Sequence, residues 1–417
     1  DGPEHKRIRE IFKVGLLKCE PLMPGGSLKA AFLLMESGKV LQNPFDGKVI
    51  EEVRDKLRLL LASLGHGDGL PRAGDMHQVI EVRLMQSLMR FFGDPDHFYG
   101  DFLARGVWLG SSERKLPRTP ALYARKVKWP LKDPEIALHG AWKANYTSLR
   151  DHERQVLRQY RAEIEDGMMV EMTLREALRR YGEKLVIAAT GAIAKKGKSV
   201  DDEVRVIYDG TNGVPLNHGI KIRDQIRFPI APDVKCVLSE LAEERVRHRG
   251  LDFDVDKAHR RSMVEEPEWG RQACQVKGSA ATTAQRKRTE KRAKALAASE
   301  VESVAPATLR AEDFSKTELE ESVFLNKVGT FGVTSAGYWW GRTGGASVRL
   351  GHYVTGYEDA LWALLYSDDG KVVGRGEFLE RAVLLYFFVM VIIGIPISWR
   401  KVHGGEASEW IGYWVDV

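Results

Sequence analysis

The sequence contains few cysteines, and none lies in a pairing pattern. The three in 417 residues, Cys19, Cys236 and Cys274, are far apart and show no CxxC or Cys/His spacing. A disulfide framework and a zinc site are therefore not supported, and we expect a reducing, intracellular compartment, cytoplasmic or nuclear. The chain also lacks an initiating Met and a basic leader followed by an apolar run. A fragment of a longer reading frame without a secretory signal is the expectation.

Positive and negative residues are nearly balanced in the composition. Lys and Arg number 63 against 58 Asp and Glu, which gives a net charge of +5. This mild basicity permits a polyanionic partner without requiring one. With 43% hydrophobic and 29% charged residues, the chain as a whole is neither disordered nor collagen-like, and its length suggests two to three domains.

A long run without charge covers residues 382–399, AVLLYFFVMVIIGIPISW, and is near the lower length limit of a membrane span. Gly394 and Pro396 interrupt the run. They favour a buried helix, a stop at the glycine and a short strand over residues 395–399. A membrane-attached protein using this run is one alternative for the chain.

Residues 1–165 read as mostly helical and carry no chemical signature. Apolar periodicity and capping signals predict helices at several places, namely 51–64, 78–92, 151–165, 173–181 with Thr173 and Glu176 at capping-box spacing, and 233–249 ending at Gly250. A hairpin with a cationic tip is expected from strands over 185–193 and 204–210. Residues 278–320 form a basic, Ala-rich insertion that we interpret as exposed and partly helical or disordered. A Gly-rich loop is expected over 341–357.

Two groups of carboxylates suggest chemistry. In ALLYSDDGKVVG, Asp368 and Asp369 sit at a predicted hairpin turn, where adjacent carboxylates repel unless a cation neutralises them. In LDFDVDKAHRR, Asp252, Asp254 and Asp256 alternate and so share one face of a strand. Each group alone is also explained by water-facing turn or edge residues. Together, a strand Asp and a turn Asp pair supply what two-metal phosphoryl chemistry requires, which is carboxylates that hold two Mg²⁺ ions.

The order of the motifs resembles that of reverse transcriptases of the retroelement type. LDFDVDKAHRR is similar to their Asp-x-x-x-Ala-aromatic motif, with Asp254 and Ala258 in register, and LLYSDDG to their Tyr-x-Asp-Asp box. The other resembling segments are VRVIYDG, TFGVTSAGYWW, in which Gly337 replaces a proline, GIPISWRK and EWIGYWVD. The set covers about residues 185–417.

The resemblance implies roles residue by residue. Asp254, Asp368 and Asp369 would bind two Mg²⁺ ions, with Mn²⁺ as a possible substitute, and Lys401 would donate a proton to the leaving pyrophosphate. Lys198, Arg205, His259, Phe331 and Gly332 would contact the incoming nucleotide, and Trp410, Gly412 and Tyr413 would form the primer-grip strand. Without the resemblance, a solvated hairpin tip and core aromatics explain several of these residues.

Three features depart from the family. His259 stands where a bulky aromatic residue excludes a ribose 2′-hydroxyl, so we expect weaker sugar selection. The insertion falls between two motifs that the family connects more briefly. No thumb follows Val417 in this sequence, so incomplete handling of a duplex is expected.

The sequence therefore predicts an α+β right-hand polymerase with fingers and an antiparallel palm sheet backed by helices. The expected regions are a helical N-terminal region over 1–165, a fingers-like region over 166–250 and a palm over 251–417. The expected activity is RNA-directed DNA polymerisation from deoxynucleoside triphosphates on an RNA or DNA template with a primer, without a membrane. A catalytically inactive nucleic-acid-binding remnant of such an enzyme is the other alternative. Template preference and oligomeric state are left open.

Overall fold

The computed structural model describes residues 2–67, 78–111, 114–120, 142–195, 204–214, 216–220, 222, 224, 226–242, 246–297, 310–356 and 361–416. Helices and antiparallel sheets both contribute, which confirms the α+β class. The helices are α1 Pro3–Cys19, α2 Leu28–Glu36, α3 Gly47–Ser63, α4 Val82–Phe91, α5 Tyr99–Arg105, α6 Thr147–Arg150, α7 Glu153–Glu165, α8 Leu174–Tyr181, α9 Leu216–Gly219, α10 Ala231–Ala242, α11 Ala280–Ala297, α12 Lys316–Leu319, α13 Thr334–Thr355 and α14 Leu379–Ile392.

The strands of the described residues form four small sheets. One has four strands in the order β7-β8-β4-β9, another has three in the order β1-β6-β5, and β2-β3 and β10-β11 are hairpins. The strands are β1 Met169–Thr173, β2 Ala189–Ala194, β3 Val204–Asp209, β4 His248–Asp254, β5 Ala273–Cys274, β6 Ser322–Asn326, β7 Leu361–Tyr366, β8 Asp369–Arg375, β9 His403–Gly405, β10 Ala407–Trp410 and β11 Tyr413–Asp416.

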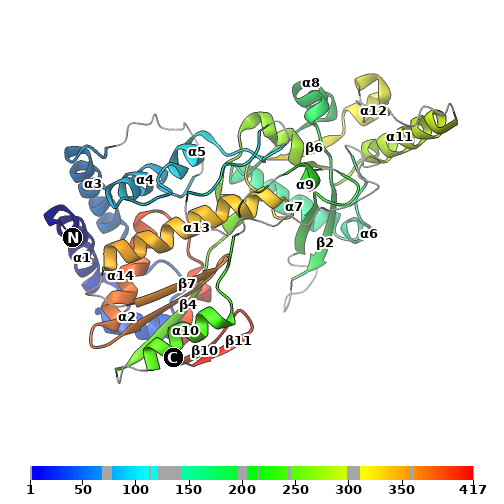
Figure 1. Ribbon diagram of the computed structural model, residues 1–417. Coiled ribbons are helices and arrows are strands. Elements are labelled where there is room, and N and C mark those ends of the chain that lie inside the picture. The colour runs from blue at the N-terminus through cyan, green and yellow to red at the C-terminus, as the bar shows by residue number, and fades with distance from the viewer. Residues whose placement is uncertain are drawn as a thin grey trace.

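The four-stranded sheet is covered on both faces. Leu251 and Phe253 of β4 point into the main core, which includes residues of α13 and α14. The opposite face carries Val373 of β8, which packs with Val237 of α10. The β10-β11 hairpin joins α10 on that side through Trp410. Figure 1 shows α13 crossing the molecule, with β7 and β4 on one side of it and α4 and α5 on the other.

The apolar run becomes α14, and nearly every side chain of this helix is buried. Helices α1, α2 and α3 pack against it, so a helix that is hydrophobic all round lies in a protein core. Gly394 ends the segment with a φ of +77°, as expected of a glycine stop. The strand expected over 395–399 is wrong, because only Ile397 pairs, in a single bridge with Val255. Across the described ranges, no helix combines the length and apolarity needed to cross a membrane.

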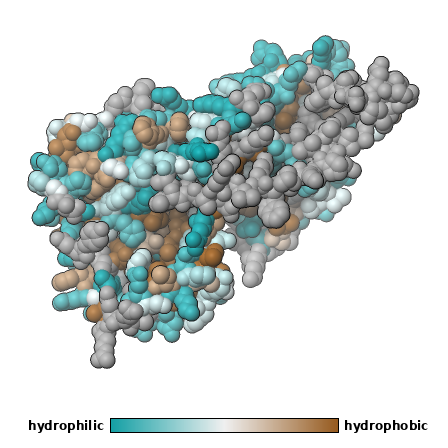
Figure 2. Space-filling view, in the orientation of Figure 1, coloured by the Kyte–Doolittle hydropathy of each residue, from teal (hydrophilic) through white to brown (hydrophobic). Residues whose placement is uncertain are grey.

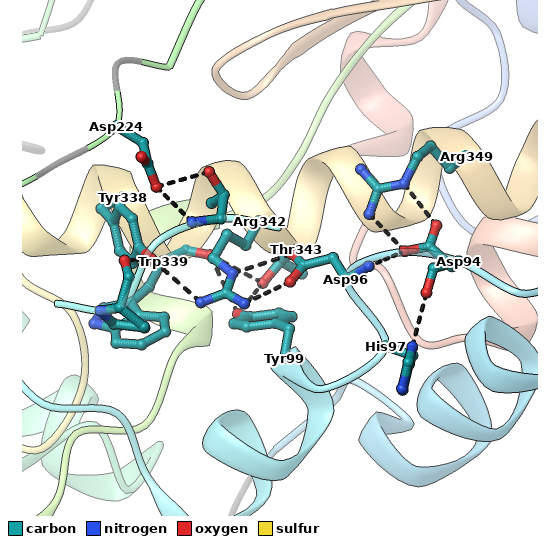
Figure 3. A network of polar contacts seen from close by, with 12 residues as sticks. Asp94, Asp96, His97, Tyr99, Asp224, Tyr338, Trp339, Arg342, Thr343 and Arg349 are labelled. Carbon is teal, nitrogen blue, oxygen red and sulfur yellow. Dashed lines mark hydrogen bonds and ion pairs between the residues drawn. The ribbon is translucent and has the colours of Figure 1, made fainter. Parts of the chain in front are cut away.

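Buried ion pairs tie the N-terminal helical region to α13 (Figure 3). The Arg342 guanidinium donates to both Asp96 carboxylate oxygens at 3.0 and 2.5 Å, and its side chain is only 3% exposed. Two turns further along, Arg349 donates to both oxygens of the fully buried Asp94 at 2.6 and 3.1 Å. Paired burial of this kind is how charged groups are accommodated in a protein interior. Residues 94–96 are thereby fixed on α13.

Two predicted elements differ from the structure. The expected Gly-rich loop over 341–357 is mostly the C-terminal part of α13, because its glycines allow close packing: a Cβ at Gly344 would lie 2.7 Å from Leu365, and one at Gly351 2.4 Å from Tyr386. The helix expected over 233–249 is shorter, and Gly250 lies within β4, where it pairs with Val373 and Gly405. Pairing with neighbouring strands overrides the local stop signal there.

Candidate active site

Two carboxylates from distant parts of the sequence face each other at one end of the four-stranded sheet. Asp254 is the last residue of β4 and Asp369 the first of β8, and the antiparallel register pairs them directly. Residues directly opposite in a ladder project to the same side of the sheet. The backbone N–H of Val255 donates to the Asp368 carbonyl at 2.9 Å, which fixes the turn beside the end of β4.

The turn that carries Asp368 is held in an unusual backbone conformation. Ser367 has a φ of +59°, a value that few non-glycine residues adopt outside tight turns. The indole N–H of Trp340, on α13, donates to the Ser367 carbonyl at 2.7 Å. The long helix therefore positions the Asp368-Asp369 pair from beneath. The predicted β7-β8 hairpin around this pair is confirmed.

The ammonium of Lys401 contacts the Asp254 carboxylate. Burial alone would lower the pKa of Lys401, but the bond to Asp254 and the charges of Asp369 and Asp368 outweigh it and raise that pKa. Burial raises the pKa of Asp254 despite the bond from Lys401, and the charge of Asp368 adds to the rise. Burial also raises the pKa of Asp369, followed by repulsion from Asp368 and Asp254. The site thus concentrates negative charge that one lysine only partly offsets.

The other two aspartates of the alternating motif have different partners. Asp252 shares the strand face with Asp254 but is buried, and the Lys371 ammonium donates to its Oδ1 at 2.8 Å and to the Ser408 hydroxyl at 2.7 Å. Asp256 lies beyond the end of β4 and forms an ion pair with Arg261 at 2.7 Å. The expectation of three aspartates on one strand face is therefore wrong for Asp256. Lys371, a cation that directly precedes the apolar Val372 and Val373 in β8, was the sequence signal for the buried partner.

His259 and Phe331 lie together near the carboxylates. Their rings meet edge to face with centroids 5.9 Å apart, and the Phe331 side chain is 57% exposed. Burial lowers the pKa of His259, while the negative charge of Asp368 acts in the opposite direction. A neutral imidazole can both donate and accept a hydrogen bond. The two rings form an aromatic wall beside the Asp-Asp turn.

Gly332 joins this wall to the β2-β3 hairpin. Its φ is +99°, and a Cβ there would lie 2.0 Å from the Tyr208 carbonyl of β3. Only glycine fits such an approach without displacing the strand. Arg205 also belongs to β3, where it is exposed and pairs in register with Ile193. Within the described residues, Arg205 makes no contact with the site carboxylates, and Lys198 lies outside those residues.

The predicted primer-grip strand is a hairpin instead. Trp410 ends β10, Tyr413 begins β11, and a two-residue turn at Ile411 and Gly412 separates them with φ values of +45° and +82°. Positive φ at both turn residues matches the twist of a tight hairpin. Trp410 is buried against Val234 of α10 and so has a core position, whereas Tyr413 is 47% exposed.

A cavity of about 480 Å³ lies beside the Asp-Asp turn. It lies between α13, β7 and the segment Ile226–Pro229, with Leu365 and Ser367 in its lining. Figure 2 shows apolar residues gathered on this face where Figure 1 draws α13 and β7. Ser367 thus connects the Asp-Asp turn to a cavity whose lining also includes the charged side chains of Arg227, Asp233 and Arg349.

The acidic side chains at this end of the sheet do not form a finished metal cage among the described residues. In the part of the chain that the structure describes, no three acidic, His or Cys side chains converge closely enough to hold a metal ion ready-made. Carboxylate oxygens are nevertheless the ligands that Mg²⁺ prefers. Asp254 and Asp369 stand opposite one another with raised pKa values, and the cation now at Asp254 is a side chain that is 67% exposed.

No protein-family model and no curated protein matches the chain. Among solved structures, it is similar to a foamy viral protease-reverse transcriptase in complex with double-stranded DNA. The TM-score is 0.41 at 10% sequence identity, over 71% of this chain and 39% of that chain. The chain thus aligns with well under half the length of that protein.

Proposed function

We propose that the chain is the polymerase part of a retroelement reverse transcriptase, which transfers nucleotides to a primer 3′-hydroxyl on an RNA or DNA template. One observation carries the proposal: Asp254, Asp368 and Asp369 come together with Lys401 at one end of an antiparallel sheet. The order and identity of the sequence motifs agree with it. The β7-β8-β4-β9 sheet would be the palm, and the β2-β3 hairpin would belong to the fingers.

In this proposal the three carboxylates hold two Mg²⁺ ions, or Mn²⁺ in their place. When bound, such ions stabilise the attacking and leaving oxygens of the phosphoryl transfer. Lys401 is protonated at neutral pH, as lysines ordinarily are, and despite burial the bond to Asp254 raises its pKa further, so it would have a proton to give to the leaving pyrophosphate. The lysine must leave Asp254 before both carboxylate oxygens are open to a metal ion.

The nucleotide would lie against the aromatic wall of His259 and Phe331, beside Gly332. Arg205, and with it Lys198, would contact the triphosphate, where cations offset the charge on the phosphoryl oxygens. The β10-β11 hairpin would hold the primer end through the exposed Tyr413, while Trp410 and Gly412 shape the hairpin. The deoxynucleoside triphosphates and the primer-template are then the expected partners.

Primer extension tests this function. The chain is incubated with a labelled primer on RNA and on DNA templates, with Mg²⁺ or Mn²⁺, alongside Asp254→Asn and the control Asp55→Asn. Asp55 carries an exposed ion pair on α3, which contributes little. We expect Asp254→Asn to lose extension by at least about 100-fold while binding of the primer-template is kept, and the control to match wild type. Extension that survives Asp254→Asn refutes the proposed site.

A catalytically inactive nucleic-acid-binding protein is the second candidate. The observation that favours it is the lysine already seated on Asp254, together with the lack of a ready-made metal cage among the described residues. Under this alternative the Lys401-Asp254 pair is a permanent ion pair. Binding of primer-template without extension on either template, with either metal ion, would select it.

A further inference from the structure

The basic insertion contains an ordered helix that projects from the body of the protein. Helix α11 has 18 residues, or about 27 Å at the usual rise per residue. Figure 1 shows it extending at the end of the molecule opposite α1 and α14. Six of the nine residues in 286–294 are Lys or Arg, and one is Glu. We call residues 285–294 the basic arm.

The base of α11 is firmly fixed. Glu321 accepts from the Ser279 and Ala280 N–H groups at 2.8 and 3.1 Å, and Glu318 accepts from the Thr283 hydroxyl at 2.5 Å. Burial alone would raise the pKa of Glu318, but hydrogen bonds from Thr283 and Ser315 lower it to about 2. Carboxylates near a helix N-terminus also stabilise the helix through their interaction with its dipole. The anchoring gives the arm a defined direction.

The basic arm has no apolar stripe of its own. Among the side chains of α11 that the structure describes, the buried alanines, including Ala280 and Ala284, lie in the first turns. From Gln285 to Ala297 the only large apolar residue is Leu296. A helix that docks in a protein groove or on a membrane surface needs an apolar face, whereas a phosphodiester backbone is recognised by charge alone.

Positive charge continues at the base of α11. A cavity of about 270 Å³ lies there, and its lining includes Lys143, Arg150 and Lys277. Glu153 forms an ion pair with Lys277 at 3.4 Å. The side chains of Arg286 and Lys294 on the arm are exposed. A cationic surface therefore runs from the body of the protein onto the arm.

We propose that the basic arm binds the phosphate backbone of nucleic acid at a position separate from the carboxylate site. The observations that carry it are the anchored base, the density of cations and the absence of an apolar stripe. Neutralising n phosphates makes the logarithm of the binding constant fall with salt by about 0.9n for duplex DNA and 0.7n for single strands. The arm should thus contribute a measurable share of the salt dependence.

The test uses the full chain without nucleotides, so that binding is measured apart from chemistry. In the arm variant, Arg286, Arg288, Lys291, Arg292 and Lys294 are changed to Gln, a good helix former. The matched control changes five exposed cations of the N-terminal region, Lys6, Arg7, Lys29, Lys39 and Lys48, to Gln. Both variants lose the same charge, from +5 to 0. Affinity for a labelled 20-base-pair duplex and a 20-nucleotide single strand is measured from 50 to 300 mM NaCl.

We expect the arm variant to bind at least about 10-fold more weakly at 100 mM salt, with a salt slope smaller by about 2 to 4, while the control stays near wild type. A third variant with Arg286, Arg288 and Arg292 changed to Lys keeps the charge and should keep the slope. Equal losses in the arm variant and the control would overturn the proposal, and so would a loss in the Lys variant. If the wild-type chain extends a primer and the arm variant binds nucleic acid as tightly as wild type, the proposed role of the basic arm is refuted, but the proposed polymerase function is not.

Discussion

The buried pair of Asp252 and Lys371 offers a quantitative test of how the candidate site is built. The two residues are register partners on β4 and β8, and their side chains are 6% and 2% exposed. The lysine also donates to Ser408 of β10, so one ammonium group connects the sheet to the β10-β11 hairpin. Replacing Lys371 with Met keeps the length of the side chain but removes its charge.

Lys371→Met leaves the Asp252 carboxylate buried without its lysine counter-ion, and a change of this kind costs about 3–5 kcal/mol. Asp252→Leu should cost a similar amount, because it leaves the ammonium unpaired. In the double variant an apolar pair replaces the ions, which is often neutral or even stabilising by about 1–4 kcal/mol. The loss of the bond to Ser408 offsets about 1 kcal/mol of this. The coupling energy between the two positions, which is the sum of the single losses minus the loss of the double variant, should therefore be at least about 5 kcal/mol.

Hydrogen exchange of the β4 and β8 amides measures the free energy of opening for this sheet in each variant. Lys18→Met serves as a control, since Lys18 and Glu52 form a 2.5 Å pair with side chains 45% and 40% exposed, and a solvent-exposed pair of this kind contributes little to stability. A double variant whose loss equals the sum of the two single losses would refute the argument that the ions compensate each other.

Two further changes test the site. Asp369→Asn should raise the free energy of unfolding at pH 7 by less than about 1 kcal/mol, because burial and repulsion from Asp368 and Asp254 raise the pKa of Asp369 and disfavour its charged form. In thermal melts the gain should fade as the pH falls through the raised pKa of Asp369, and it should be gone below about 4, where the carboxyl is protonated in the folded and unfolded states alike. A lower melting temperature at pH 7 would contradict this expectation. Gly332→Ala should destabilise the fold by about 2–3 kcal/mol in urea unfolding, because the added Cβ would lie 2.0 Å from the Tyr208 carbonyl and the backbone there has a φ of +99°. Gly47→Ala is the control. No atom lies within 4 Å of its added Cβ, so this change should be nearly neutral.

Features that depend on neighbouring residues in the chain could be predicted from the sequence. Thr173 caps α8 by accepting from the Glu176 N–H, and the Asp-Asp hairpin forms where the turn signal placed it. Features that depend on distant packing could not. Gly344 and Gly351 look like loop residues locally, but they lie inside α13 because Leu365 and Tyr386 occupy the space beside them.

The candidate carboxylates also show the difference between features that depend on neighbouring residues and features that depend on distant packing. Alternation alone gave Asp252 and Asp254 the same strand face, and the structure agrees. Which of the two is neutralised within the core depends on Lys371, whose approach is set by the β4-β8 register. The β10-β11 hairpin is another case, because two residues with positive φ in Trp410–Tyr413 turn an apparent strand back on itself.

The different cations at Asp252 and Asp254 distinguish the end of the sheet, where we propose that the chemistry takes place, from its interior. Lys371 is fixed within β8 and 2% exposed, so the charge of Asp252 is permanently compensated. Lys401 follows α14 in a short helical turn, and its side chain is 67% exposed, so it can move into water at little cost. Asp252 and Asp254 lie two residues apart on one strand. The cation paired with Asp252 is buried and fixed, whereas the cation paired with Asp254 is exposed and replaceable. A cation that binds at Asp254 displaces a lysine, whereas one at Asp252 would have to open the core.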